Sequence, residues 1–427
     1  QAILDQAISG GFPRLRQPTQ SFLRPPCKML APRIAKAAKV APCQLVAAAL
    51  PRRRGMYSAG CPPGGRLPFT GFFVNPPAIV PRFREGEDKI PTDKFTIDCS
   101  PYAPAPDAVP PHELVERMEE TFSEMGVVRL TNTGLTRVED MQRYANVVVK
   151  EQMKYDGGAN PREGIIASVY EVGAPHDAWL HYHHEMAYNQ HSMKNLAFCS
   201  VKAPWGKGDT YLSENVSVTE ELMKTDLGRK LKDHGVCYIR CLTHREAYQG
   251  QGWKQGRAVY NHWQLSFGAE TPDEAVAKAH ECGLETEWCR DPLLEESGRY
   301  LKTIMRADAF EFCPSLGRNV LFSSVADHNM WFDTWKGVSD VPPEKRPLQM
   351  TFGDGSPISN EEIRQWVSLY DRGGIRVRWQ TGDIVAFCNY RFAHGRPAFD
   401  LRMWEERTIG VMLGEKFQRV GARPDAW

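Results

Sequence analysis

The sequence predicts a mainly β fold with flanking helices, built on an antiparallel sandwich or barrel. After Gly164 the chain consists of short apolar runs separated by Gly, Pro, Asn and Asp, a pattern typical of many short strands. Helical spacing of apolar residues is limited to a few segments, one of which begins at His112. We expect strands at 127–130, 165–172, 196–201, 236–241, 320–322, 375–379, 384–389 and 408–413, and further helices at 136–153, 271–282 and 359–370.

The ends of two of these helices carry local signals. Pro272 suits the first turn of the helix at 271–282, where a missing backbone N–H costs nothing. Ser359 or Asn360 can cap the helix at 359–370. The helices therefore interrupt the strand-rich part of the chain as additions to it, and we find no internal repeat.

Composition narrows the class of protein. The 427 residues carry 53 Lys and Arg against 52 Asp and Glu, so no field of one sign favours nucleic acid or anionic lipid. No apolar run approaches the roughly 20 residues that span a bilayer. The 11 cysteines are scattered and include no Cys-x-x-Cys pair, which fits a reducing compartment. We expect a soluble, intracellular protein whose partner is a small molecule, without nucleic acid or membrane; the oligomeric state is not readable.

The amino-terminal region differs from the rest of the chain in its balance of basic and acidic residues. There is no acidic residue from Gln6 to Arg84, whereas Arg and Lys recur, and Met29 could be the true start of translation. A basic, Ala-rich, acid-free stretch is typical of a mitochondrial or plastid transit peptide, with a basic tail that carries no address as the alternative. The expected organisation is a targeting or disordered extension at 1–60, a Pro-rich extended lead-in at 61–111, the catalytic domain at 112–417 and a tail at 418–427.

The segment from His181 to Met186 is the densest cluster of ionisable side chains in the sequence. On a strand, side chains alternate, so His183 and Glu185 would project to one face and His184 to the other. An imidazole and a carboxylate suit Fe(II), and a second histidine would complete a 2-His-1-carboxylate triad with open positions for substrate and O2. A similar pattern, His244 to Glu246, lies in a polar stretch that we interpret as a loop.

The stretch from Trp379 to Arg396 offers the third ligand. His394 follows an apolar strand that is entered by a Gly-Asp turn, so a rigid scaffold would present it at the mouth of a barrel. Downstream, Arg407 begins a strand in which alternation places it on the face of Ile409 and Val411. A guanidinium aimed into an apolar interior is well matched to the carboxylate of a ligand, although an internal Asp or Glu could serve instead.

From Leu114 to Leu413 the sequence resembles the taurine dioxygenase (TauD/TfdA) family, and within it the clavaminate-synthase-like branch. The motifs that carry this resemblance occur in the family's order along the chain. They are Pro161-Arg162, HHEMAY at 183–188, Lys207-Gly-Asp-Thr210, HGVCYIR at 234–240, Gly252-Trp-Lys254, Gly283 to Trp288, Met350 to Gly355 and Trp379 to Arg396.

The resemblance implies a double-stranded β-helix (jelly-roll) core with His183, Glu185 and His394 on the iron. It also implies 2-oxoglutarate as cosubstrate, with its far carboxylate on Arg407 and Thr210, and a dioxygenase that releases succinate and CO2. We expect hydroxylation of a small organic acid, amine or amino-acid-like substrate. The alternatives are a desaturase or cyclase of the same family and a non-catalytic jelly-roll protein that only binds 2-oxoglutarate.

Some positions depart from the family pattern or stay open. Cys388-Asn389 stands where the family often has Asp-Asn, so we expect the surroundings of His394 to differ. A long loop before Arg407 leaves Arg402 as a rival anchor. Glu185 argues against a halogenating enzyme, in which a small residue replaces the carboxylate. Candidates for the substrate side, each with an ordinary structural alternative, are Arg162, Tyr188, Trp205 and Asn215.

Overall fold

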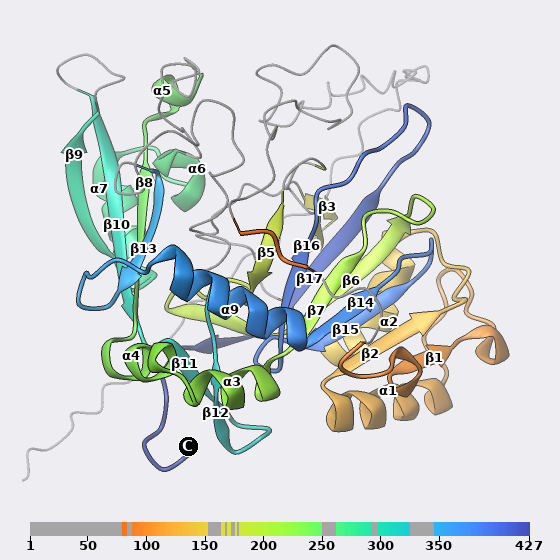
Figure 1. Cartoon of the computed structure of the whole chain (residues 1–427). Helices are drawn as coiled ribbons and strands as arrows, with labels where there is room; N and C mark the ends of the chain where they lie inside the picture. The colour runs from red at the N-terminus through yellow and green to blue at the C-terminus, as the bar shows by residue number, and fades with distance from the viewer. Residues whose placement is uncertain are drawn as a thin grey trace, which may run out of the picture. The chain divides into compact units, whose positions relative to one another are not determined.

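The computed structural model describes residues 79–82, 88–152, 164–166, 169–171, 176, 179–249, 262–291, 298–324 and 346–427. All of them lie in one unit, Arg53–Trp427. Figure 1 shows the arrangement of their helices and strands. The helices are α1 (His112–Met125), α2 (Val138–Val149), α3 (Asn215–Met223), α4 (Asp226–His234), α5 (Arg245–Gln249), α6 (Trp263–Phe267), α7 (Pro272–Glu281) and α9 (Asn360–Arg372), with 3-10 turns η1 (Thr92–Lys94) and η2 (Ser100–Tyr102).

The largest sheet has seven strands in the order β1-β2-β15-β6-β17-β4-β3. Its centre is the long antiparallel pair β6 and β17, whose middle residues are buried on both faces of the sheet. Only the pairing of β1 with β2 is parallel among the strand pairings described. The strands are β1 (Thr96–Asp98), β2 (Val127–Thr131), β3 (Gly164–Ile166), β4 (Val169–Glu171), β6 (His191–Lys202), β15 (Ile384–Cys388) and β17 (Thr408–Gln418).

A four-stranded sheet, β14-β7-β16-β5, packs against the inner face of the large sheet. Phe198 and Val411 of the large sheet share one hydrophobic core with Leu212 and Phe392 of the small sheet. Complete burial of one such side chain contributes about 1.5 to 3 kcal/mol, so the shared core fixes how the two sheets face each other. The strands of the small sheet are β5 (Leu180–His183), β7 (Thr210–Glu214), β14 (Gly374–Val377) and β16 (Phe392–Arg396).

A third sheet, β13-β8-β10-β9, and the hairpin β11-β12 are additions to this pair of sheets. The third sheet is antiparallel, and α7 packs beside its edge strand β9. The strands are β8 (Val236–Leu242), β9 (Glu285–Arg290), β10 (Arg299–Ala307), β11 (Phe310–Cys313), β12 (Arg318–Leu321) and β13 (Leu348–Phe352).

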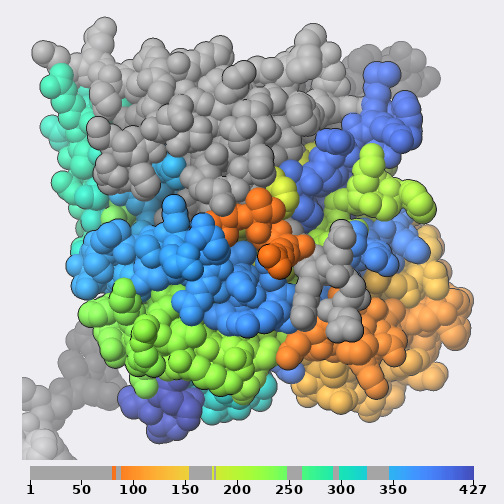
Figure 2. All heavy atoms as spheres, in the orientation of Figure 1, coloured from red at the N-terminus to blue at the C-terminus, as the bar shows by residue number. Residues whose placement is uncertain are grey.

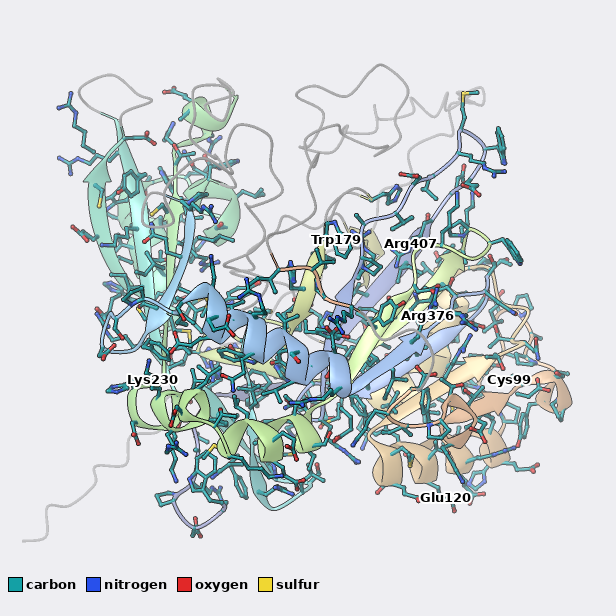
Figure 3. All side chains as sticks on the ribbon, in the orientation of Figure 1. Cys99, Glu120, Trp179, Lys230, Arg376 and Arg407 are labelled. Carbon is teal, nitrogen blue, oxygen red and sulfur yellow. The ribbon has the colours of Figure 1, made fainter. Side chains whose placement is uncertain are left out.

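Helices cover both sides of the paired sheets. α1 and α2 pack on the outer face of the large sheet through a second apolar cluster that includes Met141, Tyr144 and Met412. α9 begins with a capping box in which Ser359 and Glu362 satisfy each other's backbone N–H groups. It lies beside α3 and α4 on the face shown in Figure 2, and Lys230 of α4, labelled in Figure 3, pairs with Glu362 at 2.7 Å.

Most expected elements are present, with three corrections. The polar stretch at His244 to Glu246, interpreted as a loop, runs into helix α5. Regular structure starts before His112, because β1 pairs with β2 within the stretch expected to be an extended lead-in. The single strand expected at 165–172 is two short strands, β3 and β4, that pair with each other. The expected targeting segment, residues 1–60, lies outside the described residues. No helix within the described ranges is both long and apolar enough to cross a membrane.

Candidate metal centre

Two adjacent strands bring the candidate histidines together. β5 ends at His183, and in its antiparallel pairing with β16 the Cα partner of His183 is His394. Directly opposed residues on neighbouring strands project to the same face with Cβ atoms about 4.5 to 5.5 Å apart. The two imidazole rings accordingly lie 4.1 Å apart between centroids. Sheet register therefore joins two residues that are far apart in the sequence.

Glu185 completes the group from the turn that follows β5. Its Oε2 lies 3.7 Å from Nε2 of His394, and the donor atoms of Glu185, His394 and His183 all lie within 4.8 Å of one another. Glu185 and His394 are 3% and 6% exposed. Burial of a carboxylate is costly unless a cation or hydrogen-bond donors face it, so this arrangement fits a metal ion.

The surroundings of the histidines orient them. Nδ1 of His183 lies 2.7 Å from the carbonyl oxygen of His181. Because a carbonyl can only accept, Nδ1 carries the proton and Nε2 presents its lone pair, which is the usual way a ligand histidine is held. The His394 ring packs against Phe198 and Phe387 of the large sheet, at 5.4 and 5.5 Å. The site thus lies between the two sheets.

The donor set is compatible with Fe(II). Two imidazole nitrogens and one carboxylate on one side leave the remaining positions of an octahedral ion open, which is the arrangement of non-haem Fe(II) oxygenases. A structural zinc site would be closed by four protein ligands. Among the described residues, His183, Glu185 and His394 are the only group of this kind.

The other histidines of the cluster point elsewhere. The His184 ring lies against Phe322 at 4.9 Å, and its Nδ1 accepts the backbone N–H of Ser323, as strand alternation predicts for the residue after His183. Burial lowers the pKa of His184 to about 3, and burial followed by the charge of His183 lowers the pKa of His181 to about 3. Both stay neutral at physiological pH. The pair His244 and Glu246, 3.7 Å apart, does not join the triad.

Thr210 lies on the same face of the small sheet as the triad. It starts β7, and Leu212, two residues later, is the Cα partner of His394. The indole Nε1 of Trp379 donates to Thr210 Oγ1 at 3.0 Å in a buried contact. Since this bond uses one acceptor position of the oxygen, the hydroxyl hydrogen can be donated to a ligand.

Arg407 immediately precedes β17 and is half-buried. Its Nε donates to the carbonyl oxygen of Gly208 at 3.0 Å, and its guanidinium lies over the Phe399 ring at 5.5 Å. Figure 3 labels Arg407 near the beginning of this strand. Arg402 is exposed, with its guanidinium 5.7 Å from the Trp404 ring. Of the two arginines, Arg407 is the one held against the backbone that leads into Thr210.

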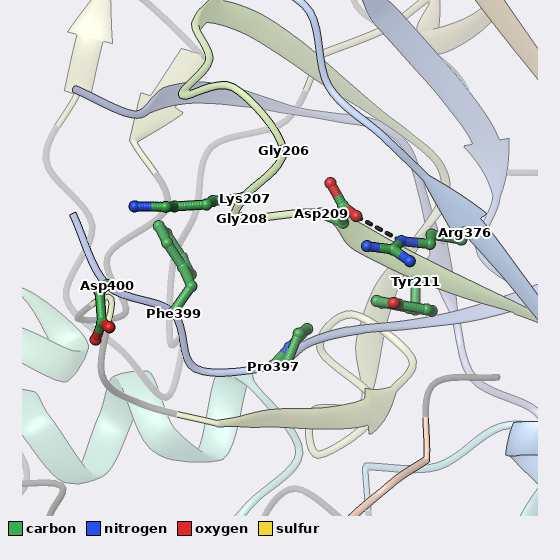
Figure 4. Close-up of a pocket in the computed structure, with 9 residues that line it drawn as sticks. All are labelled: Gly206, Lys207, Gly208, Asp209, Tyr211, Arg376, Pro397, Phe399 and Asp400. Carbon is green, nitrogen blue, oxygen red and sulfur yellow. Dashed lines mark hydrogen bonds and ion pairs between the residues drawn. The ribbon is translucent and has the colours of Figure 1, made fainter. Parts of the chain in front are cut away.

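Figure 4 shows a pocket of about 240 Å³ at the same end of the small sheet. Tyr211 and Arg376, which are Cα partners, lie on the opposite sheet face from Thr210. The Nε of Arg376 pairs with Asp209 at 2.6 Å, so the charge that lines this pocket is compensated. The lining residues are Gly206, Lys207, Gly208, Asp209, Tyr211, Arg376, Pro397, Phe399 and Asp400.

The substrate-side candidates occupy very different environments. Tyr188 is buried, with the guanidinium of Arg240 over its ring at 5.3 Å. Asn215 is fully buried, and its amide donates to the carbonyls of Leu321 and Tyr390. Trp205 is 94% exposed, and Arg162 lies outside the described residues. Their proposed contact with substrate stays a prediction.

Several residues around the site were not singled out from the sequence. Gly208 and Phe399 contact Arg407, and Trp379 contacts Thr210. Gly208 and Trp379 do fall within motifs that carry the family resemblance, but a motif does not show which residue each of them contacts in the fold. Asn389, which follows the departing Cys388 and matches the family pattern, binds the backbone of Glu185.

Comparison with known proteins shows the family to which the chain belongs. The family described as "Taurine catabolism dioxygenase TauD, TfdA family" matches residues 103–412. A clavaminate synthase-like protein of Arabidopsis thaliana is 25% identical over 289 residues, which cover 66% of this chain and 81% of that protein. The dapdiamide synthesis protein DdaC of Enterobacter agglomerans is 20% identical over 301 residues, covering 69% and 84%.

Two solved structures have lower similarity. A taurine dioxygenase from Burkholderia xenovorans has 15% identity and a TM-score of 0.39, covering 74% of this chain and 84% of that one. The PvcB protein from Pseudomonas aeruginosa has 15% identity and a TM-score of 0.40, covering 80% and 92%.

The chain belongs to the TauD/TfdA family of dioxygenases, because the family match spans most of its length. It is accordingly a 2-oxoglutarate-dependent oxidoreductase, with Fe(II), 2-oxoglutarate and O2 as the cofactor and cosubstrates. The predicted family, enzyme class and cofactors are confirmed at this level.

Proposed function

We propose that His183, Glu185 and His394 hold the Fe(II) and that Thr210 and Arg407 bind the far carboxylate of 2-oxoglutarate. The reaction we propose is hydroxylation of a small organic acid, amine or amino-acid-like substrate. One atom of O2 enters the substrate and the other enters succinate, and the 2-oxo acid also loses CO2. The observation that carries this proposal is the convergence of the three donor atoms to within 4.8 Å between two sheets.

The polar groups near Arg407 support carboxylate recognition. Thr210, whose oxygen already accepts from Trp379, can act as a donor, and a guanidinium is a donor without acceptors. A ligand held by both must offer them acceptor atoms, as a carboxylate does. Arg407 fits this role better than Arg402, because the exposed Arg402 is held by Trp404 and Glu405 in the surface loop.

Each part of the chain has a separate task in this proposal. Bound Fe(II) supplies the centre at which O2 and the 2-oxo acid react. His183 and His394 are oriented by a backbone carbonyl and by aromatic packing, so the ligand set is formed before the ion arrives. The apolar walls from Phe198 and Phe387 exclude water from one side of the site. We also propose that the two facing sheets form the double-stranded β-helix expected from the sequence.

The test is an anaerobic titration with Fe(II) and 2-oxoglutarate, followed by a screen of small acids, amines and amino acids for succinate release. We expect binding of 2-oxoglutarate only after Fe(II), and one succinate per oxidised substrate. A protein that binds 2-oxoglutarate but never releases succinate above background with any substrate would favour the sensor alternative. Product mass then separates hydroxylation, a gain of one oxygen atom, from desaturation or cyclisation, a loss of two hydrogen atoms.

For the amino-terminal region we propose organelle targeting, supported by its basic and acid-free composition. A fluorescent protein fused to residues 1–60 should enter mitochondria or plastids. A fusion that stays in the cytosol would indicate the alternative, a basic tail without an address.

A further inference from the structure

Asn389 lies directly after β15 and is completely buried. Its carboxamide forms a two-armed contact with the peptide groups of Glu185. The backbone N–H of Glu185 donates to Oδ1 of Asn389 at 2.9 Å, and Nδ2 of Asn389 donates to the carbonyl oxygen of Glu185 at 3.1 Å. Both hydrogen bonds are buried. If the Asn389 carboxamide were removed, water could not satisfy the backbone groups of Glu185 in its place.

Further bonds tie this contact to the large sheet. Nδ2 of Asn389 also donates to the carbonyl oxygen of Met193 on β6, at 3.0 Å. The backbone N–H of Asn389 donates to the carbonyl oxygen of Lys194 at 2.7 Å. Ser192 at the start of β6 donates through Oγ to the carbonyl oxygen of Glu185 at 2.8 Å. The turn that carries Glu185 is therefore fastened to two strands of the large sheet, although β5 belongs to the small sheet.

The turn at Glu185 requires such support because its backbone is strained. Met186, the next residue, has φ of 54°, in the left-handed region that a side chain with a Cβ atom rarely adopts. Strained backbone persists only where the surrounding contacts enforce it. Rotation of this peptide would swing the Glu185 carboxylate away from its position 3.7 Å from Nε2 of His394.

We propose that Asn389 is a positioning residue for the metal centre, which holds the Glu185 carboxylate toward the ion by clamping the Glu185 backbone. This inference rests on the proposed function, in which Glu185 is a metal ligand. Asn389 acts through Glu185 and needs no contact with the metal or the substrate. Its amide is specific to the task, because one end must accept and the other must donate.

The chain contains a matched control. Asn319 on β12 makes the same two-armed contact with Arg423: the backbone N–H of Arg423 donates to Oδ1 at 2.8 Å, and Nδ2 donates to the Arg423 carbonyl at 2.7 Å. Asn319 is 2% exposed and Asn389 is 0% exposed. The two substitutions to alanine thus remove the same type of buried clamp, but only one of the clamps holds a metal ligand.

The experiment is a titration of each full-length variant with Co(II), followed by its visible absorption. For Asn389→Ala we expect the dissociation constant for Co(II) to rise by about 10- to 100-fold, the usual cost of losing an outer partner of a ligand, with an altered absorption band. Asn319→Ala should lower the melting temperature to a similar degree while it keeps the wild-type affinity. The inference is overturned if Asn389→Ala binds Co(II) as wild type does, or if Asn319→Ala loses as much affinity.

Two more variants complete the design. Ser192→Ala removes one hydrogen bond to the Glu185 carbonyl and should also weaken Co(II) binding, but by a smaller factor than Asn389→Ala. If Asn389→Ala does not fold, Ser192→Ala is the deciding variant. Wild-type Co(II) affinity in Ser192→Ala would then overturn the inference. Glu185→Ala reports on the proposed function itself. If Glu185→Ala binds Co(II) as wild type does, the metal site is misassigned; if Glu185→Ala loses the metal and Asn389→Ala does not, only the positioning role fails.

Discussion

The two ends of the proposed site are built in different ways. At the metal end, His183 and His394 face each other on paired strands, and the Glu185 backbone is clamped by a buried amide. At the cosubstrate end, Arg407 precedes its strand and is held by the carbonyl of Gly208 and by the ring of Phe399. The metal end is fixed by sheet register, and the cosubstrate end by the packing of two loops.

This difference suggests that the two ends respond differently to substitution. A sheet register cannot shift by one residue without turning every side chain to the other face, so the placement of His183 opposite His394 should either be intact or fail. A loop contact can shift by small amounts. Changes at the cosubstrate end should therefore produce graded losses of 2-oxoglutarate affinity while the metal still binds.

The largest effect is expected at the metal end. His394→Ala removes one of three protein ligands, so we expect loss of metal affinity beyond the roughly 100-fold that an outer partner can cost, and no measurable succinate release. The fold should persist, as judged by circular dichroism. His244→Ala, at the half-buried partner of Glu246, is the control and should bind iron normally. Full activity of His394→Ala would refute the assignment.

The next effect tests the anchor. Arg407→Ala removes charge-assisted hydrogen bonds worth about 1.5 to 3 kcal/mol each, so 2-oxoglutarate affinity should fall at least about tenfold with Fe(II) affinity unchanged. Arg407→Lys should recover only part, because a point charge cannot reproduce a two-pronged contact. Isothermal titration under anaerobic conditions measures both constants. If Arg402→Ala loses 2-oxoglutarate and Arg407→Ala does not, Arg402 is the anchor.

A smaller effect tests whether loop packing positions that anchor. A Cβ atom on Gly208 would lie 2.7 Å from both Cδ and Nε of Arg407, so Gly208→Ala must displace the side chain. We expect the KM for 2-oxoglutarate to rise several-fold with metal affinity intact. Gly206→Ala is the control, because Gly206 has nearly the same positive φ, 68° against 69°, and a Cβ atom there would meet no described atom within 4 Å. Equal effects of the two variants would indicate backbone strain alone.

Thr210→Val should weaken 2-oxoglutarate binding by a smaller factor than Arg407→Ala does. It removes one neutral hydrogen-bond donor and keeps the shape of the side chain, which corresponds to about 0.5 to 1.5 kcal/mol and thus about 2- to 10-fold in affinity. Titration beside Arg407→Ala gives the order of the two effects. A larger loss for Thr210→Val than for Arg407→Ala would contradict the proposed division of labour between the two residues.

The smallest effect is expected from the amino terminus. Deletion of residues 1–60 should leave an active enzyme with unchanged affinity at both ends of the site. Deletion of residues 1–98 should abolish folding, because it removes buried Ile79 and strand β1. Thermal melting and 2-oxoglutarate titration of both proteins check this. Aggregation of the shorter deletion would mean that residues 1–60 belong to the fold.

Local patterns were sufficient where the physical signal is local. The helices α1, α7 and α9 begin within one residue of their expected starts, because Pro272, Ser359 and the apolar spacing after His112 act over one or two turns. The short strands β7 and β16 were not expected as strands, although each carries a predicted site residue. Both carry polar residues among their apolar ones, TYLSE and FAHGR, and so lack the apolar run that made β2 and β15 recognisable at the same length.

The sequence by itself determined which residue types could form the centre: two histidines, one carboxylate and an arginine at the start of an apolar strand. Only the tertiary structure decided that His183 lies opposite His394, that β1 joins β2 in parallel, and that Asn389 holds Glu185. The physical reason is the separation along the chain of the residues that interact. Capping and side-chain alternation depend on neighbours in the chain, whereas register and buried hydrogen bonds depend on segments that meet only when the two sheets pack together.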